Sequence, residues 1–386
     1  MTPSHSPPMR RAPGIALAAL LGALLAACGS DSGPTVPTQT LIAVGRLERG
    51  ATVRLVAREG AAGSDSVVSN LTITPATAGV VTGTTIKLVQ VGPATIGATA
   101  SDGRTLSAAV TVAAPPTVFF DAIAAGNRDI YSISLDGGDL KRWTTAPAEE
   151  SHPSVAAGLL VFSSTRDGNG ELYSLSTAAG GIEKRLTTTA ANESQPALAA
   201  GGANLAYVSD GGGVPRIFVS TAALAVPSRL TAPSFGFGGS IESDPTWSPT
   251  GDRIAFMSTT NGRANLFISP SGAGSNPTAV VGSGAQQTDV EPAWSPDGNK
   301  IVFASTRGGG TLLYLLDLKT DAFNQVTQAT GTIGQPAWLP DGRLLYTKFA
   351  AGESTLWYVD PAQSTSTPVE IPTGTKSPAH PAPLRP

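Results

Sequence analysis

Residues 291–307 read EPAWSPDGNKIVFASTR: a proline, a tryptophan, a Pro-Asp-Gly turn and an apolar run that contains an aromatic residue. Nearly the same phrase begins at Asp244, as DPTWSPTGDRIAFMSTT, and at Gln335, as QPAWLPDGRLLYTK. A phrase that recurs in this way indicates repeated structural units, and such units decide the fold before any single residue does.

The proline that opens each phrase recurs at intervals of 43 to 49 residues. These prolines are Pro153, Pro196, Pro245, Pro292, Pro336 and Pro381. An apolar run with an aromatic residue follows, and a second aromatic stands 11 residues further on, as in Phe303 and Tyr314, or 12 residues in the last complete unit, from Tyr346 to Tyr358. Four short strands in about 45 residues are typical of one blade of a β-propeller.

The ends of the repeat region complement each other. Residues 117–145 supply the last three strands of a further unit, with Phe120 and Tyr131 again 11 residues apart, but they lack a proline-bearing first strand. The segment AHPAPLRP, from Ala379, matches SHPSVAAG, from Ser151. We therefore expect the C-terminal strand to complete the first blade, which closes the ring and removes exposed sheet edges. The prediction is a six-bladed propeller over residues 117–386.

These phrases resemble the WD40-like repeats of the TolB family. The likeness covers residues 117–386 and is strongest in the units that begin at Asp244, Glu291 and Gln335. It implies the propeller fold. TolB proteins bind partner proteins and carry an α/β domain before the propeller, whereas this chain begins differently, so the resemblance does not transfer their partners.

Residues 40–114 form a second β region. Short alternating apolar runs are separated by Gly, Pro, Asn and Asp, which predicts a small β-sandwich. The stretch with Gly92, Ala94 and Ile96, followed by an Asp102-Gly103 hairpin, resembles bacterial immunoglobulin-like domains of group 2. The fold class predicted for the chain is all-β: an immunoglobulin-like β-sandwich followed by the propeller.

The N-terminal segment reads as an export signal. Arg10 and Arg11 precede an apolar run that ends in Leu25-Ala26-Ala27-Cys28. This pattern resembles the lipobox of bacterial lipoproteins, which implies a signal peptide over 1–27 and lipid on Cys28. The alternative is an ordinary secretory signal with an incidental cysteine. Gly29, where retained lipoproteins of enteric bacteria have Asp, implies the outer membrane. Residues 28–39 read as a flexible tether.

Composition narrows the classes of partner. Charged residues make up 14% of the 386 residues and the net charge is −3, so the clustered basic residues that bind nucleic acid are not indicated. The single cysteine excludes an internal disulfide. We expect a monomer without a cofactor, bound to the membrane through Cys28.

The residue before each of the six prolines is polar. These residues are His152, Gln195, Asp244, Glu291, Gln335 and His380. Two positions earlier, four consecutive units carry an acid: Glu150, Glu193, Glu242 and Asp289. If the proline opens the innermost strand, these side chains form a polar ring around one mouth of the central channel. The ring either holds water or recognises a partner's loop or cationic group.

The sequence is compatible with two functions, a metal-dependent enzyme and a binding scaffold. His152 and His380 hold the same repeat position in adjacent blades, and imidazole suits transition metals. Oligogalacturonide lyases are propeller enzymes with a His- and Gln-bound metal, which implies a metal-dependent polysaccharide lyase as the alternative. No Gly-x-Ser-x-Gly, Walker or HExxH motif supports a hydrolase. Asp244 and Glu291 would repel a uronate. The favoured reading is a cell-envelope lipoprotein whose propeller is a non-catalytic scaffold that binds a protein or glycan.

Overall fold

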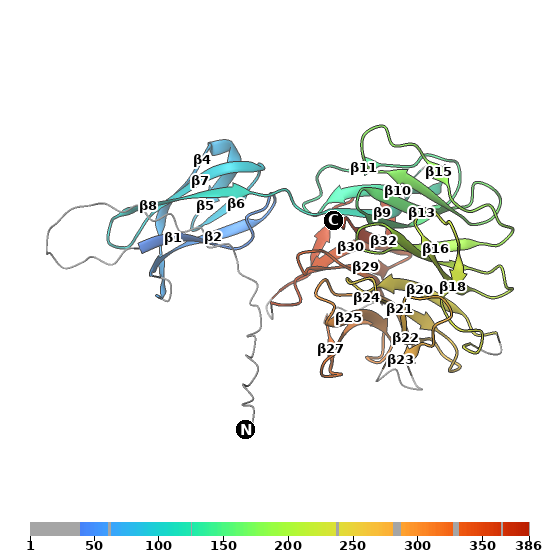
Figure 1. The fold of residues 1–386 in the computed structure, drawn as a ribbon. Coiled ribbons are helices and arrows are strands. Elements are labelled where there is room, and N and C mark those ends of the chain that lie inside the picture. Colours follow the sequence, from blue (N-terminus) through green and yellow to red (C-terminus); the bar gives the residue numbers. More distant parts are fainter. Residues whose placement is uncertain are drawn as a thin grey trace, which may run out of the picture. The chain divides into compact units, whose positions relative to one another are not determined.

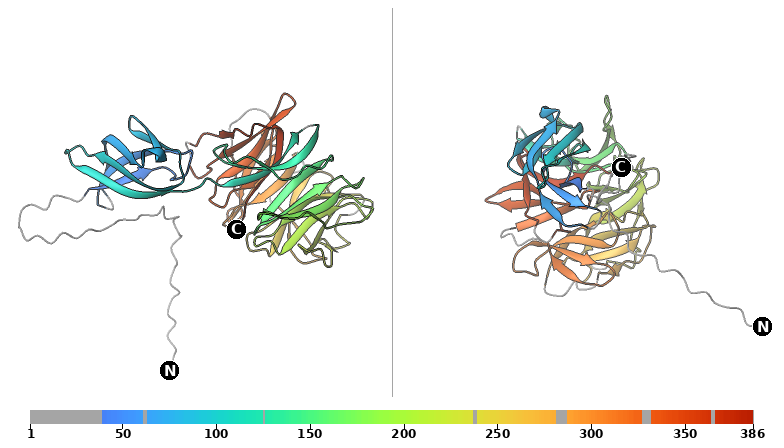
Figure 2. Two further views of the ribbon diagram at one scale, coloured as in Figure 1. Left: turned by 90° about the horizontal axis from the view of Figure 1, so that it is seen from above. Right: turned by 90° about the vertical axis from the view of Figure 1, so that its left-hand side faces the viewer.

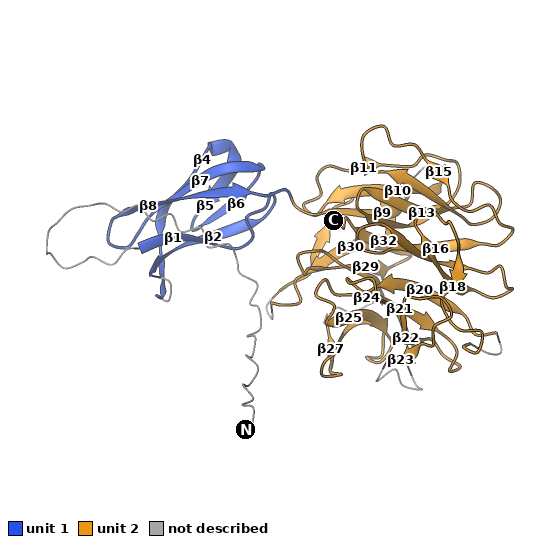
Figure 3. Cartoon of the chain, viewed as in Figure 1, with its two compact units in different colours: residues 1–114 blue, residues 115–386 orange. Residues whose placement is uncertain are grey.

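The computed structural model describes residues 39–60, 63–124, 126–236, 239–280, 287–326, 332–363 and 366–385. The predicted signal peptide, Cys28 and nearly all of the predicted tether lie outside these ranges. The chain divides into two compact units, residues 1–114 and 115–386 (Figure 3). No helix of membrane-spanning length and hydropathy occurs in the described ranges.

The first unit is a two-sheet β-sandwich. One sheet has the order β1-β2-β6-β5, with β3 paired to β2, and the other has the order β4-β7-β8. The bounds are β1 Gln39–Val44, β2 Thr52–Glu59, β3 Asp65–Val67, β4 Ser69–Thr74, β5 Gly79–Thr82, β6 Thr85–Leu88, β7 Gly92–Thr99 and β8 Thr105–Val112, with a short 3-10 helix at Ala76–Ala78. Alternate residues of β2, β6 and β7 fill the core between the sheets, including Val53, Ile86 and Ile96. The immunoglobulin-like family of this unit stays a prediction.

The second unit consists of six four-stranded antiparallel sheets (Figure 1). Blade 1 is formed by β32 Lys376–Pro383, β9 Thr117–Ala124, β10 Asn127–Ser134 and β11 Lys141–Arg142. Blade 2 is formed by β12 Glu150–Ala156, β13 Leu159–Ser164, β14 Glu171–Ser176 and β15 Lys184–Arg185. Blade 3 is formed by β16 Glu193–Leu198, β17 Asn204–Ser209, β18 Arg216–Thr221 and β19 Ser228–Arg229.

The remaining blades repeat this order of strands. Blade 4 is formed by β20 Glu242–Trp247, β21 Arg253–Ser258, β22 Asn265–Pro270 and β23 Thr278–Ala279. Blade 5 is formed by β24 Asp289–Trp294, β25 Lys300–Ser305, β26 Leu312–Asp317 and β27 Phe323–Gln325. Blade 6 is formed by β28 Thr332–Trp338, β29 Leu344–Ala350, β30 Glu353–Val359 and β31 Val369–Ile371.

The predicted closure of the ring is confirmed. β32, at the end of the chain, pairs antiparallel with β9, which opens the second unit. The first strands of successive blades contact one another around the axis, from β12 through β16, β20, β24 and β28 to β32 and back to β12. Figure 2 shows the propeller strands from two further directions. Each of these inner strands therefore contacts the inner strands of the two neighbouring blades.

The repeated aromatics hold the middle strands of each blade in register. Phe162 lies opposite Tyr173 and Phe303 opposite Tyr314, with ring centroids 6.0 and 6.4 Å apart. Phe162 and Phe303 are fully buried, so they also fill the space between neighbouring sheets. In blade 6 the predicted partner was wrong: Tyr346 lies opposite Trp357, not Tyr358, so the spacing of 11 residues holds there too.

The Pro-Asp-Gly segments form the expected turns between first and second strands. Gly298 has φ of 69° and its N–H bonds to Ser295 O, and Gly342 has φ of 86° and bonds to Leu339 O. A positive φ at this position suits glycine because it has no Cβ to clash with the backbone. These turns bring the second strand back beside the proline-bearing inner strand.

Candidate functional site

The residue before each inner-strand proline has an unusual backbone conformation. All six have positive φ: 54° at His152, 50° at Gln195, 54° at Asp244, 55° at Glu291, 52° at Gln335 and 46° at His380. A residue before proline normally stays extended, and a residue with a side chain seldom enters the left-handed region. The same conformation in six blades is therefore a built feature of this propeller. We call these six residues the channel ring.

A bulge in each inner strand explains this conformation. The register between first and second strands shifts here in every blade, for example between Ser243 and Thr246 and between Val290 and Ala293. Because proline has no N–H, the interrupted ladder leaves no donor unpaired at that position. The bulge turns the preceding side chain toward the axis, so the Xaa-Pro pair of the sequence encodes a side chain that faces the channel.

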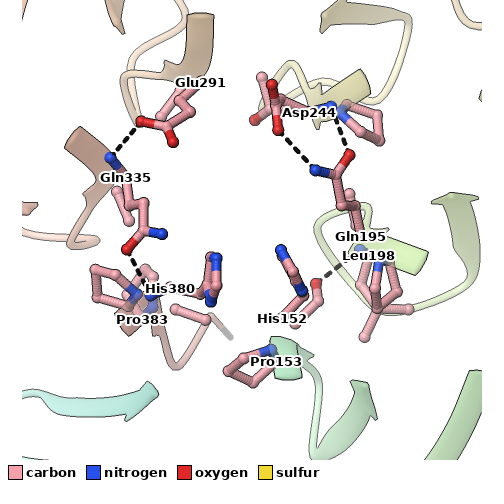
Figure 4. Close-up of a pocket in the computed structure, with 18 of the residues that line it drawn as sticks. His152, Pro153, Gln195, Leu198, Asp244, Glu291, Gln335, His380 and Pro383 are labelled. Carbon is pink, nitrogen blue, oxygen red and sulfur yellow. Dashed lines mark hydrogen bonds between the residues drawn. The ribbon is translucent and has the colours of Figure 1, made fainter. Parts of the chain in front are cut away.

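The channel ring lines one central cavity of about 230 Å³ (Figure 4). The six prolines and the small residues that follow them, such as Ser154 and Ala293, form its wall. The structure thus places all six sequence-predicted ring residues around the same space.

Hydrogen bonds link the ring from one blade to the next. The N–H of Asp244 donates to Gln195 Oε1 at 2.9 Å, and the Gln195 amide donates to Asp244 Oδ1 at 2.9 Å. The N–H of Glu291 donates to the Asp244 carboxylate. The N–H of Gln335 donates to Glu291 Oε2 at 2.6 Å, and that of His380 to Gln335 Oε1 at 3.0 Å. Four of the six bulged backbones, those of Asp244, Glu291, Gln335 and His380, are thereby tied to the ring side chain of the previous blade.

Asp121 completes this chain of hydrogen bonds between blades 1 and 2. It comes from β9, is fully buried, and its Oδ2 accepts the N–H of His152 at 3.1 Å and contacts His380 Nδ1 at 2.6 Å. Arg128 pairs with its other oxygen. Burial opposes ionisation, yet the interactions with His380 and Arg128 hold the pKa of Asp121 below its usual value.

Asp121 was not predicted, although the sequence carries a signal for it. It follows the aromatic Phe120, and the corresponding positions of the other blades hold Ser163, Val208, Met257, Ala304 and Thr347. An acid at that place in only one unit indicates a local partner. Asp121 lies on β9, the second strand of its blade, so the alignment of the inner strands does not include it.

The two histidines stack on each other across the seam between blades 1 and 2. Their ring centroids lie 3.8 Å apart with an angle of 33° between the planes. Burial, followed by the electrostatic effect of the neighbouring His380, lowers the pKa of His152 to about 3. His152 is therefore neutral at physiological pH, and it stacks as a neutral ring on its neighbour.

The predicted metal arrangement gains no support from this geometry. His380 directs Nδ1 at Asp121, and His152 Nδ1 lies 3.0 Å from Ser151 Oγ. Within the described ranges no group of three or more His, Cys, Asp or Glu side chains is placed to hold a metal ion.

Asp244 and Glu291 form an acidic half of the ring. Burial raises the pKa of Asp244, and burial together with the charge of Asp244 raises the pKa of Glu291. Among the described residues no Lys or Arg interacts with either carboxylate. Two carboxyl groups without a Lys or Arg partner therefore lie on the side of the cavity formed by blades 4 and 5.

The four acids two positions before the ring do not face the channel, contrary to prediction. Glu150, Glu193, Glu242 and Asp289 are at most 2% exposed and lie outside the cavity lining. Arg166 pairs with Glu150, and Arg307 with Asp289 at 3.0 Å. Side chains two apart share a face of a regular strand, but the bulge breaks that alternation, so these acids tie strands and blades together instead.

Comparison with known proteins agrees with this architecture. Residues 238–381 match the family model described as the TolB beta propeller domain, which is where the three fullest phrases stand. The second unit is a β-propeller, and its residues 238–381 are similar to the propeller domain of the TolB family. No curated protein matches the sequence.

Solved structures share the fold at low sequence identity. TolB from Acinetobacter baumannii has a TM-score of 0.62 and 14% identity, and the match covers 78% of this chain and 81% of that one. A protein assigned as TolB from Agrobacterium tumefaciens has a TM-score of 0.53 and 15% identity over 66% and 88% of the two chains. A chain of a nidogen/laminin complex has a TM-score of 0.55 and 11% identity over 69% and 98%. At these identities the similarity shows a shared fold and nothing about function.

Proposed function

We propose that the TolB-like propeller is a non-catalytic scaffold that docks a protein or glycan of the bacterial cell envelope on the channel ring. The observation that carries this proposal is the ring itself. Six side chains from six blades converge on one cavity, and hydrogen bonds between blades fix the backbone of five of them: His152, Asp244, Glu291, Gln335 and His380. A surface held rigid before binding loses little conformational entropy when a partner docks.

The charge on the ring supports recognition of a partner that presents a positive group. Asp244 and Glu291 lie on adjacent blades, and no Lys or Arg of the described propeller interacts with them. Their raised pKa values mean that the folded protein holds these carboxylates at a cost. A cationic loop of a partner would relieve that cost, whereas an anionic loop would be repelled.

The N-terminal sequence supports a location at the membrane surface. Acyl chains on Cys28 would anchor the chain, since each buried CH₂ contributes about 0.8 kcal/mol. The β-sandwich would then act as a spacer. In this proposal the outer membrane is the site of anchoring, as Gly29 suggests.

The experiment is crosslinking in cells followed by mass spectrometry of the full-length protein. Asp244→Asn with Glu291→Gln removes both charges, yet each amide oxygen can still accept the backbone N–H that its carboxylate accepts. The matched control is Asp321→Asn with Glu370→Gln, two exposed acids outside the cavity. We expect a partner that is captured by wild type and control and lost in the ring variant. Capture of the same proteins by all three would contradict docking on the ring.

A further inference from the structure

One charged side chain of the central cavity has no partner in the ring. Arg385 lies five residues after His380 on the C-terminal segment and lines the same cavity. Its backbone forms a bridge with Ala156, the last residue of β12, and its carbonyl accepts the N–H of Ala157 at 3.2 Å. His152, a member of the channel ring, lies near the other end of β12. Arg385 and the channel ring are therefore at opposite ends of the inner strands.

The guanidinium of Arg385 is isolated. Among the described residues it makes no ion pair, and no side-chain or backbone oxygen accepts from it. Other arginines of the propeller behave differently: Arg128 pairs with Asp121, Arg166 with Glu150 and Arg307 with Asp289. Burial lowers the pKa of Arg385, and no acidic group counters that effect. A half-buried, unpaired charge is costly, and proteins normally pair it.

The surroundings of Arg385 define the chemistry that would pair it. The cavity lining beside the inner-strand ends is apolar, with Val155, Leu198, Trp247 and Pro383. Trp247 already donates its indole N–H to Ala197 O at 2.9 Å. A guanidinium presents a planar fork that matches a carboxylate, and one arginine balances one negative charge. A phosphate or sulfate, with more charge, would need additional donors.

We propose that Arg385 binds a carboxylate carried on an apolar body, at the end of the cavity remote from the channel ring. The inference extends the proposed function by naming a ligand class for the channel, but it rests on different residues. Loss of partner capture in the Asp244/Glu291 variant and loss of carboxylate binding in an Arg385 variant are separate results, so either proposal can fail alone.

Two pairs of probes test the site by isothermal titration calorimetry. N-acetyl-L-leucine represents a peptide C-terminus and hexanoate a free aliphatic acid; N-acetyl-L-leucinamide and hexanamide are the uncharged counterparts. We expect at least one carboxylate to bind about tenfold or more tightly than its amide, because a charge-assisted hydrogen bond is replaced by a neutral one. The acid that binds more tightly identifies the source of the carboxylate.

Variants assign the effect to Arg385. Arg385→Gln should bind acid and amide alike, and Arg385→Lys should keep part of the preference. Arg263→Gln, at an exposed arginine outside the cavity, should bind as wild type does. Thermal unfolding of each variant verifies that it is folded. Equal binding of acid and amide to wild type, an unchanged preference in folded Arg385→Gln, or no binding of either acid would overturn the proposal.

Discussion

His380 Nδ1 lies 2.6 Å from Asp121 Oδ2, although 259 residues separate the two in the chain. The contact joins β32, at the C-terminal end, to β9, at the start of the propeller. The same carboxylate accepts the N–H of His152 in blade 2 and pairs with Arg128 in blade 1. Asp121 is therefore the point at which the two ends of the ring and the next blade meet.

Replacing Asp121 by Asn should destabilise the propeller strongly. The amide keeps the size of the side chain but removes the buried counter-charge of Arg128 and one of the two carboxylate oxygens that contact Arg128, His152 and His380. Removing one partner of a buried pair costs about 3–5 kcal/mol, which urea unfolding would measure. Asp252→Asn, at an exposed side chain, serves as the control. A decrease in the unfolding free energy of less than about 0.5 kcal/mol would show that the contacts of Asp121 contribute little to stability.

Deleting residues 376–386 should open the ring. The deletion removes β32, so β9 loses its inner neighbour and exposes a row of unpaired backbone groups. We expect broader, less cooperative unfolding and concentration-dependent association in size-exclusion chromatography. A truncated protein that stays monomeric and unfolds as sharply as the full chain would contradict closure by the C-terminal strand.

The acidic half of the ring should make stability depend on pH. The folded pKa values of Asp244 and Glu291 are raised, so the folded state binds more protons than the unfolded state. Their contribution to stability is then greatest below the unfolded carboxyl pKa of about 4 and falls as pH rises through the folded values. Asp244→Asn with Glu291→Gln should raise the unfolding free energy at pH 7 relative to wild type, and this gain should shrink at pH 4. A gain of equal size at both pH values would mean that charge is not its cause.

His152 should stay neutral through the physiological range. Its pKa of about 3 lies far below the ordinary value, so its imidazole signals should not titrate between pH 5 and 8 in an NMR series. The folded pKa is depressed, so this group's contribution to stability is present above about pH 6.5 and is lost as pH falls toward 3. His152→Gln would assign the signal. Titration of that signal near pH 6.5 would show that the imidazole is solvated, not buried against His380.

The fold could be predicted from the sequence wherever a pattern of residues repeats. The spacing of the prolines and paired aromatics predicts six blades, and the match of the C-terminal segment to the His152 unit predicts the closing strand; both are confirmed. The same alignment predicts which six side chains meet at the channel, because equivalent positions of a propeller lie around one axis. The repeat could not predict Asp121, whose role depends on a single blade, or the buried position of Glu150 and its equivalents.

What the sequence by itself determined is the period, the number of blades, the closure and the membership of the channel ring, since these follow from regular spacing and from proline in the inner strand. Only the tertiary structure decided where the neighbouring side chains point. The bulge at each ring residue breaks the two-residue alternation, sending Glu242 between blades and Asp244 into the cavity. The tertiary structure also decides that Arg385 stays unpaired, because only the folded ring sets which charges can reach one another. Alternation is a local property of a strand, whereas burial and pairing of charge depend on the strands that surround it.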